Sequence, residues 1–270
     1  MTEIFKRIAT IVILVSLLFL LFIYGTNVSF IVIIYLITIL SFYEWLRLTS
    51  KPIYYIFPFF LLLILLDYFK TIDIYFLSLL ILPLLVILAS LTFSNESYLR
   101  TKIKQFSITF GIFITVSFFL FLTNFYPYDN TLQSNAKLID NKHYFIILIS
   151  LVSFIDMSAY ICGKLIGRNR IKSSISPNKT YEGYFGSLIF TFMFFILVSY
   201  HLSFQWTYLD IFTLLLFIVS VFYGDLLMSL VKRIFEVKDS GSLLPGHGGI
   251  LDRLDGYFTS LPIFYMWFLF

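Results

Sequence analysis

Charged residues are scarce in this sequence, and the shortage limits the fold classes open to it. Only 13% of the 270 residues are charged, whereas 60% are hydrophobic. A soluble domain usually carries about 25% charged residues, so an ordinary water-soluble fold is excluded. The apolar residues also come in long unbroken runs, which indicates that lipid surrounds much of the chain. We therefore expect a membrane protein.

Cysteine and the common catalytic motifs are also lacking. The single cysteine, Cys162, excludes an internal disulfide framework and any metal site built from several cysteines. The sequence has no GxxxxGK[ST], HExxH or GxSxG segment, which excludes a P-loop, a zinc-protease helix and a hydrolase nucleophile elbow. The net charge of +4 is modest, and we expect no nucleic-acid partner.

Nine apolar runs are long enough to cross, or nearly cross, a bilayer core of about 30 Å. They lie near residues 8–25, 28–45, 53–69, 72–93, 106–126, 144–163, 184–202, 208–228 and 257–270. The third run is short, and the ninth is barely long enough. No small-residue cleavage site follows the first run, so we interpret it as a retained helix instead of a secretory signal. The predicted fold is an all-α polytopic integral membrane protein with about nine transmembrane helices.

The basic residues favour one orientation of these runs. If the N-terminus lies inside and the loops alternate sides, the inner segments hold all but three of the 19 Lys and Arg residues. The exceptions are Lys70, Lys137 and Lys142. Omitting the short third run weakens this asymmetry. Because cytoplasmic loops carry the excess of Lys and Arg, we predict nine spans and a cytoplasmic N-terminus.

Two long loops on the predicted inner side hold most of the residues that could carry chemistry. They span residues 164–183 and 229–256. We divide the chain into an N-terminal scaffold of lipid-embedded helices, 1–140, and a C-terminal catalytic region, 141–270, that carries both loops. Seven of the 15 carboxylates lie in or beside these loops: Asp156, Glu182, Asp225, Glu236, Asp239, Asp252 and Asp255. Acids in membrane helices usually face a partner or a polar cavity, so each could also be purely structural.

The second loop contains residues suited to binding phosphates and a metal ion. On a helix, Asp225, Ser229, Lys232 and Arg233 share one face at three- and four-residue spacing. The Gly-rich turn 245–249 can bring backbone N–H groups close to an anion. Asp252 and Asp255 follow one helical turn apart and can share a hard cation such as Mg²⁺. This combination is typical of phosphoryl or nucleotidyl transfer.

A basic loop with solvated charges and a flexible turn is the alternative interpretation. It does not account for carboxylates, a histidine and glycines in the same place. The first loop supports the transfer chemistry, because Ser176, Lys179, Thr180 and Glu182 offer hydroxyls, a cation and an acid just before a span. Alone this segment is an ordinary helix entry. Opposite the second loop it becomes a substrate clamp.

These segments together resemble the signature of the phosphatidate cytidylyltransferases, also called CDP-diglyceride synthases. The matching positions are Ser229, Lys232-Arg233, Lys238-Asp239, Pro245–Gly249, Asp252-Arg253 and Asp255. SPNKTYEG at 176–183 is similar to the SPxKTxEG stretch of that family, and Asp156 with Ala159, Tyr160 and Gly163 resembles its upstream acidic helix. The N-terminal half resembles the family only in being hydrophobic.

The resemblance implies a multi-span helical enzyme that converts CTP and phosphatidate to CDP-diacylglycerol and pyrophosphate with Mg²⁺, leaving a second metal ion open. It implies metal binding by Asp225, Asp252 and Asp255. The implied catalytic residues are Asp225, Lys232, Arg233, His247, Asp252 and Arg253. The implied substrate-binding residues are Ser176, Lys179, Thr180, Glu182, Ser229, Lys238, Asp239, Gly248 and Gly249.

Two positions depart from the family pattern. Met228 stands where members often have an acid, and Gly256 stands where they commonly have a serine. Two other functions remain open: a related CTP-dependent enzyme acting on an isoprenoid lipid, and a membrane transporter with cationic gating loops. We expect a multi-pass protein of the cell membrane, with its active site facing the cytoplasm. Its expected partners are CTP, phosphatidate and membrane lipids, and homo-oligomerisation stays open.

Overall fold

The computed structural model describes residues 2–69, 101, 103–125, 141–171, 175–176, 179–201 and 207–269. All regular elements in these residues are helices, apart from isolated bridges between Arg170 and Thr180 and between Leu244 and Gly248. The prediction of an all-α membrane protein is confirmed. The fourth predicted span, 72–93, lies outside the described residues.

The helices follow the apolar runs closely. The N-terminal half forms α1 (Thr2–Tyr24), α2 (Asn27–Leu48), the short 3₁₀ helix η1 (Ile53–Tyr55), α3 (Ile56–Phe69) and α6 (Ser107–Phe125). The C-terminal region forms α7 (Asn141–Ile166), α8 (Tyr181–His201), α9 (Tyr208–Ile234) and α10 (Leu251–Leu269). Helix α9 continues past the predicted span, and α10 begins ahead of it. Both extensions add polar turns that carry predicted site residues.

Four of the described helical segments are long and apolar enough to cross a membrane: Asn27–Leu48, Phe145–Ile166, Tyr181–Tyr200 and Tyr208–Ile234. Three shorter apolar segments accompany them: Val15–Tyr24, Ile53–Tyr68 and Ser107–Thr123. Large apolar side chains such as Phe57, Phe185 and Leu197 are exposed on the outer surface. This arrangement suits contact with lipid. The total of nine spans stays a prediction.

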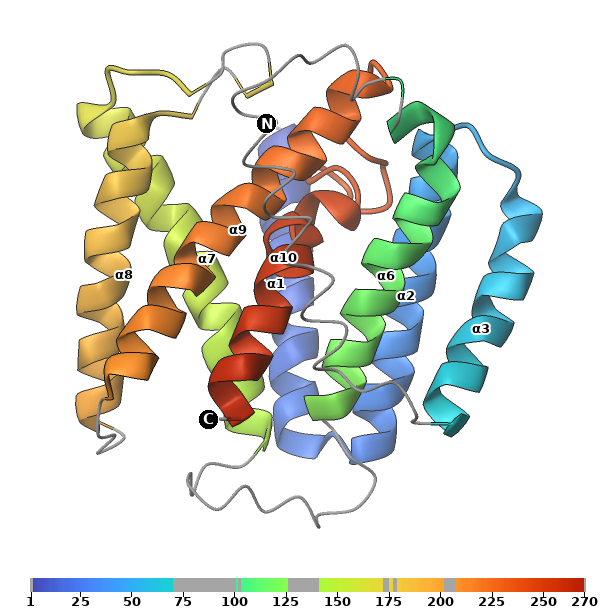
Figure 1. Ribbon diagram of the computed structural model, residues 1–270, viewed down its shortest axis with the longest axis horizontal. Coiled ribbons are helices and arrows are strands. Elements are labelled where there is room, and N and C mark those ends of the chain that lie inside the picture. Colours follow the sequence, from blue (N-terminus) through green and yellow to red (C-terminus); the bar gives the residue numbers. More distant parts are fainter. Residues whose placement is uncertain are drawn as a thin grey trace.

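The helices form two groups joined by α9 and α10. Helices α7 and α8 pack together at one edge of the molecule, and α2 packs on α6 and α3 at the other. Helix α9 crosses obliquely between the two groups and packs mainly on α10, which also contacts α6 (Figure 1). Buried side chains such as Trp45, Phe119 and Ile155 fill the space between the helices.

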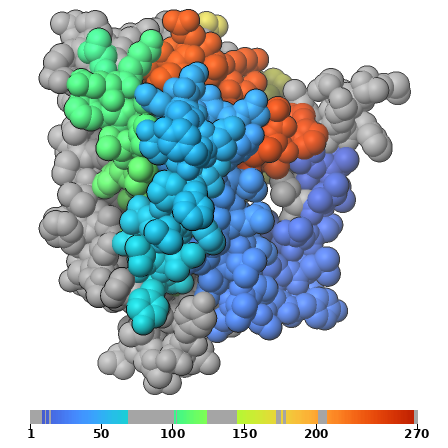
Figure 2. Space-filling view, turned by 90° about the vertical axis from the view of Figure 1, so that its right-hand side faces the viewer, coloured from blue at the N-terminus to red at the C-terminus, as the bar shows by residue number. Residues whose placement is uncertain are grey.

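Both predicted motif loops lie at the same end of the bundle. The start of α1 and the ends of α2, α7 and α9 lie toward the upper end in Figure 1, as do the starts of α3, α6 and α8. The connections from α7 to α8 and from α9 to α10 therefore converge there. Figure 2 shows the segment after α9, in orange, directly beside the end of α2 and the residues that follow it.

Candidate functional site

A close crossing of α9 and α10 forms the base of the site. A side-chain carbon added at Gly224 would lie only 2.3 Å from the backbone oxygen of Asp255, so only glycine permits this approach. The Thr259 hydroxyl donates a hydrogen bond to the Ser220 carbonyl across the same interface, at 2.6 Å. Asp225 directly follows Gly224, and the crossing therefore brings it beside the first turns of α10.

Lys179 joins the first loop to this crossing. Its ammonium group forms an ion pair with the Asp225 carboxylate. Burial lowers the pKa of Lys179 to about 8, while attraction to Asp255 and Asp156 opposes that shift. The lysine of the first loop thus lies among acids from α7, α9 and α10. The Lys179 and Asp225 side chains are 22% and 27% exposed, but the ammonium nitrogen of Lys179 itself is buried.

Asp252 lies at the centre of the second loop. Its Oδ1 accepts a hydrogen bond from the Lys232 ammonium at 2.7 Å. Its Oδ2 accepts from the backbone N–H of Ser240 at 2.8 Å, from the Ser240 hydroxyl at 3.0 Å and from the backbone N–H of Gly249 at 3.0 Å. One carboxylate therefore ties the end of α9, the loop and the start of α10 together.

The Gly-rich turn closes over this carboxylate. Gly246 and Gly248 adopt positive φ angles of 77° and 83°, which side chains other than glycine rarely tolerate. Two backbone hydrogen bonds, both 2.9 Å long, close the turn. The N–H of Leu244 donates to the carbonyl of Gly248, and the N–H of His247 donates to the carbonyl of Leu244. The Nδ1 atom of His247 is buried without a hydrogen-bond partner among the described residues. A ligand bound in the turn would supply the missing partner.

The arginines of the second loop contact backbone carbonyls. Arg253 donates to the carbonyl of His247 at 3.0 Å, and Arg233 donates to the carbonyl of Ile175 at 3.4 Å. Arg233 thereby links the two loops. Other predicted site residues lie at the same end of the bundle: Lys238 and Asp239 are exposed, and Ser176 and Ser229 are partly exposed.

Thr180 and Glu182 have evident local roles. The Thr180 hydroxyl accepts from the N–H of Gly183 at 3.2 Å and so caps the start of α8. Glu182 accepts from the backbone N–H groups of Arg168 and Asn169 at 3.1 Å and from the Asn169 amide at 2.8 Å. These contacts hold the first loop in shape. Substrate binding by either residue stays a prediction.

The acids suit a hard cation in type and position. Asp225 and Asp252 each contact an ammonium group, so both already neutralise a positive charge. Among the described residues, no group of three or more His, Cys, Asp or Glu side chains is arranged to hold a metal ion. Mg²⁺ commonly uses one or two carboxylates, with substrate phosphates and water completing its shell. The donor set fits that arrangement, in which the substrate supplies the remaining ligands.

The two residues that depart from the family pattern, Met228 and Gly256, are packed against neighbours. Met228 is buried, and Gly256 lies against Val221 and Val152. The backbone N–H of Gly256 donates to Asp255 Oδ1 at 2.8 Å. The backbone of residue 256 therefore contacts a predicted metal-binding acid, although the side-chain hydroxyl common in the family is missing.

The N-terminal half contributes one acid that the sequence interpretation missed. Glu44 of α2 is buried, and it contacts the segment between α9 and α10. The usable signal was an acid inside an apolar membrane helix, which usually faces a partner or polar cavity. The partner of Glu44 could not be identified from the sequence, because the two motif loops lie far from Glu44 along the chain.

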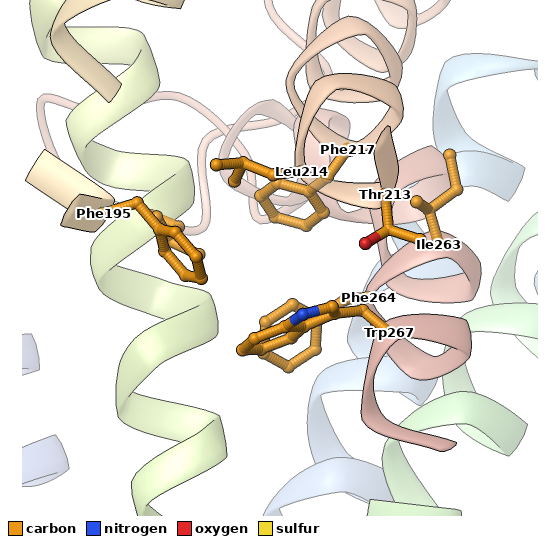
Figure 3. Close-up of a pocket in the computed structure, with 8 residues that line it drawn as sticks. Phe195, Thr213, Leu214, Phe217, Ile263, Phe264 and Trp267 are labelled. Carbon is orange, nitrogen blue, oxygen red and sulfur yellow. The ribbon is translucent and has the colours of Figure 1, made fainter. Parts of the chain in front are cut away.

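A separate cavity lies among the apolar parts of α7 to α10 (Figure 3). Its volume of about 10 Å³ is enough for one water molecule. Its lining side chains carry no charge: Leu151, Phe195, Thr213, Leu214, Phe217, Ile263, Phe264 and Trp267. Such a cavity cannot hold a nucleotide, so the charged end of the bundle is the candidate site.

Comparison with known proteins relates the chain to one family. The sequence profile described as "Cytidylyltransferase family" matches residues 5–270. Proteins named phosphatidate cytidylyltransferase from Staphylococcus haemolyticus (strain JCSC1435) and Staphylococcus aureus (strain COL) are 44% and 41% identical over 128 and 127 residues. Each match covers 46% of this chain and 48% of the relative. The chain thus aligns with about half the length of these curated relatives.

Proposed function

Because the chain belongs to the cytidylyltransferase family, we propose that it transfers a cytidylyl group from CTP to phosphatidate. The products are CDP-diacylglycerol and pyrophosphate. One observation carries the proposal: the ion pairs Lys179–Asp225 and Lys232–Asp252 lie in the two motif loops, at one end of a bundle of apolar helices. A nucleotide from water and a phosphate on a lipid can meet at such an end.

The bond changes are those of in-line phosphoryl chemistry. An oxygen of the phosphatidate phosphate attacks the α-phosphorus of CTP, and a new P–O bond forms. The bond from the α-phosphorus to the bridging oxygen breaks, and pyrophosphate leaves with the electron pair. The attacking phosphate is already ionised near neutral pH, so positioning and charge stabilisation matter more than a strong base.

The basic side chains bind the phosphates in this proposal. Lys232, Arg233 and Arg253 offset charge on the departing pyrophosphate. Lys179 binds phosphate from the first loop, and Lys238 does so from the exposed side. Ser176, Thr180, Ser229 and Asp239 line the substrate path, and Glu182 holds the first loop in shape. Lys179 and Lys232 already pair with acids in the site, so a phosphate can replace a carboxylate as their partner.

The Gly-rich turn binds or orients a phosphate oxygen. Gly248 permits close approach of backbone N–H groups, and the Gly249 N–H, which donates to Asp252, would have to change partner to join them. His247 orients or protonates an oxygen through its buried ring. A Mg²⁺ ion, held by Asp225 and Asp252 with Asp255 nearby, would neutralise charge on the CTP phosphates when bound. A second metal ion would use the same acids.

The proposed location is the cell membrane, with the active site facing the cytoplasm. Both motif loops lie at the end of the bundle where the basic residues gather, and cytoplasmic loops carry that excess. CTP would arrive from the cytoplasm, while the acyl chains of phosphatidate would stay in the bilayer. Exposed apolar side chains along the helices support this contact with lipid.

Pyrophosphate release by the purified protein in lipid nanodiscs tests the proposal. We expect release that requires CTP, Mg²⁺ and phosphatidate together, with a matching CDP-lipid product. Pyrophosphate release with an isoprenoid phosphate but not with phosphatidate would show that the lipid substrate is an isoprenoid phosphate. The proposed reaction class would still hold. Nucleotide or lipid flux without pyrophosphate, in folded protein, would contradict the enzymatic proposal and indicate a transporter.

A further inference from the structure

Glu44 contacts the catalytic loop from the opposite half of the chain. Its side chain is 1% exposed. Its Oε2 accepts hydrogen bonds from the backbone N–H of Leu251 at 2.9 Å and from the hydroxyl of Ser240 at 3.2 Å. Leu251 begins α10, where backbone N–H groups lack partners within the helix. A carboxylate from α2 therefore caps the helix that carries Asp252.

The loop backbone is shaped around this carboxylate. A side-chain carbon at Gly241 would lie 2.5 Å from Glu44 Oε1, and the other close atoms also belong to Glu44. The φ angle of Gly241 is not unusual, so the backbone conformation does not require glycine at this position. The Glu44 side chain does require it, because it leaves no room for a side chain at position 241.

Glu44 and Asp252 share one hydroxyl group. The Ser240 Oγ lies 3.2 Å from Glu44 Oε2 and 3.0 Å from Asp252 Oδ2. A serine hydroxyl has a single hydrogen, so it can donate a full hydrogen bond to only one of the two acids. The direction of the Ser240 hydroxyl therefore decides how many donors Asp252 has.

The second carboxylate oxygen of Glu44, Oε1, lowers the stability of the folded protein. Oε1 is buried without a hydrogen-bond partner among the described residues. An unpaired buried carboxylate oxygen lowers stability, and a neutral amide of the same size would avoid part of that loss. A role limited to packing or capping therefore does not account for a carboxylate at this position.

We propose that Glu44 is a positioning residue for Asp252. Three donors reach Asp252 Oδ2, which has two lone pairs, so turning the Ser240 hydroxyl to Glu44 leaves this oxygen with its two backbone donors. These backbone bonds hold the carboxylate in place, and Oδ1, which accepts from Lys232 with one lone pair, would use the other to engage the cation that accompanies the substrate phosphates. This inference rests on the proposed function and adds a residue from the N-terminal half to it.

Glu44→Gln tests the proposal because it preserves size while removing the charge. We expect its unfolding temperature to equal or exceed that of the parent protein. We expect kcat for pyrophosphate release to fall at least about tenfold, with the KM for CTP changed less than about threefold. Glu44→Asp retains the charge and should recover part of kcat. Ser41→Ala is the matched control, because Ser41 is buried on the same helix and its hydroxyl donates to the Ile37 carbonyl one turn earlier.

Amide hydrogen exchange provides a readout that does not depend on turnover. In Glu44→Gln we expect exchange across residues 239–251 to quicken at least about threefold, while exchange within α9 stays unchanged. Parental kcat with parental exchange would overturn the proposal. An unfolding temperature that falls together with activity would also overturn it, since Glu44 would then be structural. If the parent protein releases no pyrophosphate, the proposed function fails, and exchange alone decides whether Glu44 positions the loop.

Discussion

Two lysine–carboxylate pairs define the site at the scale of single residues. Lys179 lies in the first loop and Asp225 lies on α9, so only folding brings this pair together. Lys232 and Asp252 come from consecutive helices. In the proposed reaction the acid of each pair would exchange its lysine for a metal ion, and the lysine would exchange its acid for a phosphate. The pairs therefore keep buried charges neutral before the substrate arrives.

Removing the charge of either acid should stop turnover. Asp225→Asn and Asp252→Asn preserve side-chain size but weaken cation binding, so we expect each to lose more than about 90% of activity, or more than about 1.4 kcal/mol in barrier. Pyrophosphate release in nanodiscs measures the loss, and unfolding temperature checks that each variant is folded. Glu236→Gln is the control, because Glu236 is exposed and is not among the predicted site residues. More than a tenth of parental activity would contradict cation binding at that acid.

Lys179 should set an alkaline limit to activity. Burial lowers its pKa to about 8, and only the protonated form attracts phosphate. The attraction is therefore present at lower pH and is lost as the pH rises through about 8. We expect kcat/KM for CTP to decline across that range. In Lys179→Arg the decline should move to higher pH, because a guanidinium group has a pKa of about 12 or more.

The shape of the pH profile separates this role from a general loss of activity. Lys179→Arg can lower the maximum rate, because arginine is larger than lysine. A decline at the same pH in the parent protein and in Lys179→Arg would assign the alkaline limit to another group.

The end of α9 directs the second loop at the scale of elements. The N–H of Val237 bonds the Lys232 carbonyl at 2.9 Å, and the N–H of Glu236 bonds the Arg233 carbonyl at 3.2 Å. Glu236 itself adopts a positive φ of 59°. These bonds form a Schellman-type helix end, which reverses the chain toward α2 and α10. Helix α2 ends similarly at Ser50, with φ 54°.

The α9–α10 crossing should be sensitive to a single methyl group. In Gly224→Ala the new carbon would meet the Asp255 backbone, which cannot rotate away, so the helices must separate. We expect a loss of about 1–3 kcal/mol in stability and a larger proportional loss of activity. Gly256→Ala is the matched control on the opposing helix, because its nearest contact is a Val221 methyl carbon at 3.1 Å.

Thermal unfolding and pyrophosphate release together measure both effects. We expect the parent protein to be the most stable, Gly256→Ala to be less stable, and Gly224→Ala to be the least stable. Equal stability of the two alanine variants would show that the crossing tolerates a wider spacing. It would also remove the structural reason for glycine before Asp225.

Long-range contacts were the part that the sequence could not predict. Helix positions followed from apolar runs, and local periodicity gave the helical spacing of Asp225 with Lys232 and of Asp252 with Asp255. Glu44 was missed because its partners, Ser240 and Leu251, lie far along the chain and no local pattern links them. The local contacts of Thr180 and Glu182 became evident only from the folded loop, since a hydroxyl near an acid also suits a substrate.

The distribution of charge distinguishes the two ends of the whole molecule. Basic residues gather at the end that carries both motif loops, where Lys51, Lys164, Arg168, Lys232 and Lys238 lie after the ends of helices or within their last turns. Among the described residues, Lys142 at the start of α7 is the exception at the opposite end. The asymmetry that the sequence predicted thus corresponds to two physical ends of one bundle. CTP can reach the site only if the basic end faces the nucleotide pool.

Cysteine labelling can establish which end faces the cytoplasm. The single native cysteine, Cys162, is buried and can be replaced by serine. In that background, Ser242→Cys places a thiol in the exposed second loop, and Tyr208→Cys places one at the opposite end, where Tyr208 is 94% exposed. Because basic loops stay in the cytoplasm, a membrane-impermeant maleimide should label Tyr208→Cys in intact cells and Ser242→Cys only after permeabilisation. Labelling of Ser242→Cys from outside would reverse the orientation, separate the loops from cytoplasmic CTP and contradict the proposed reaction at that face.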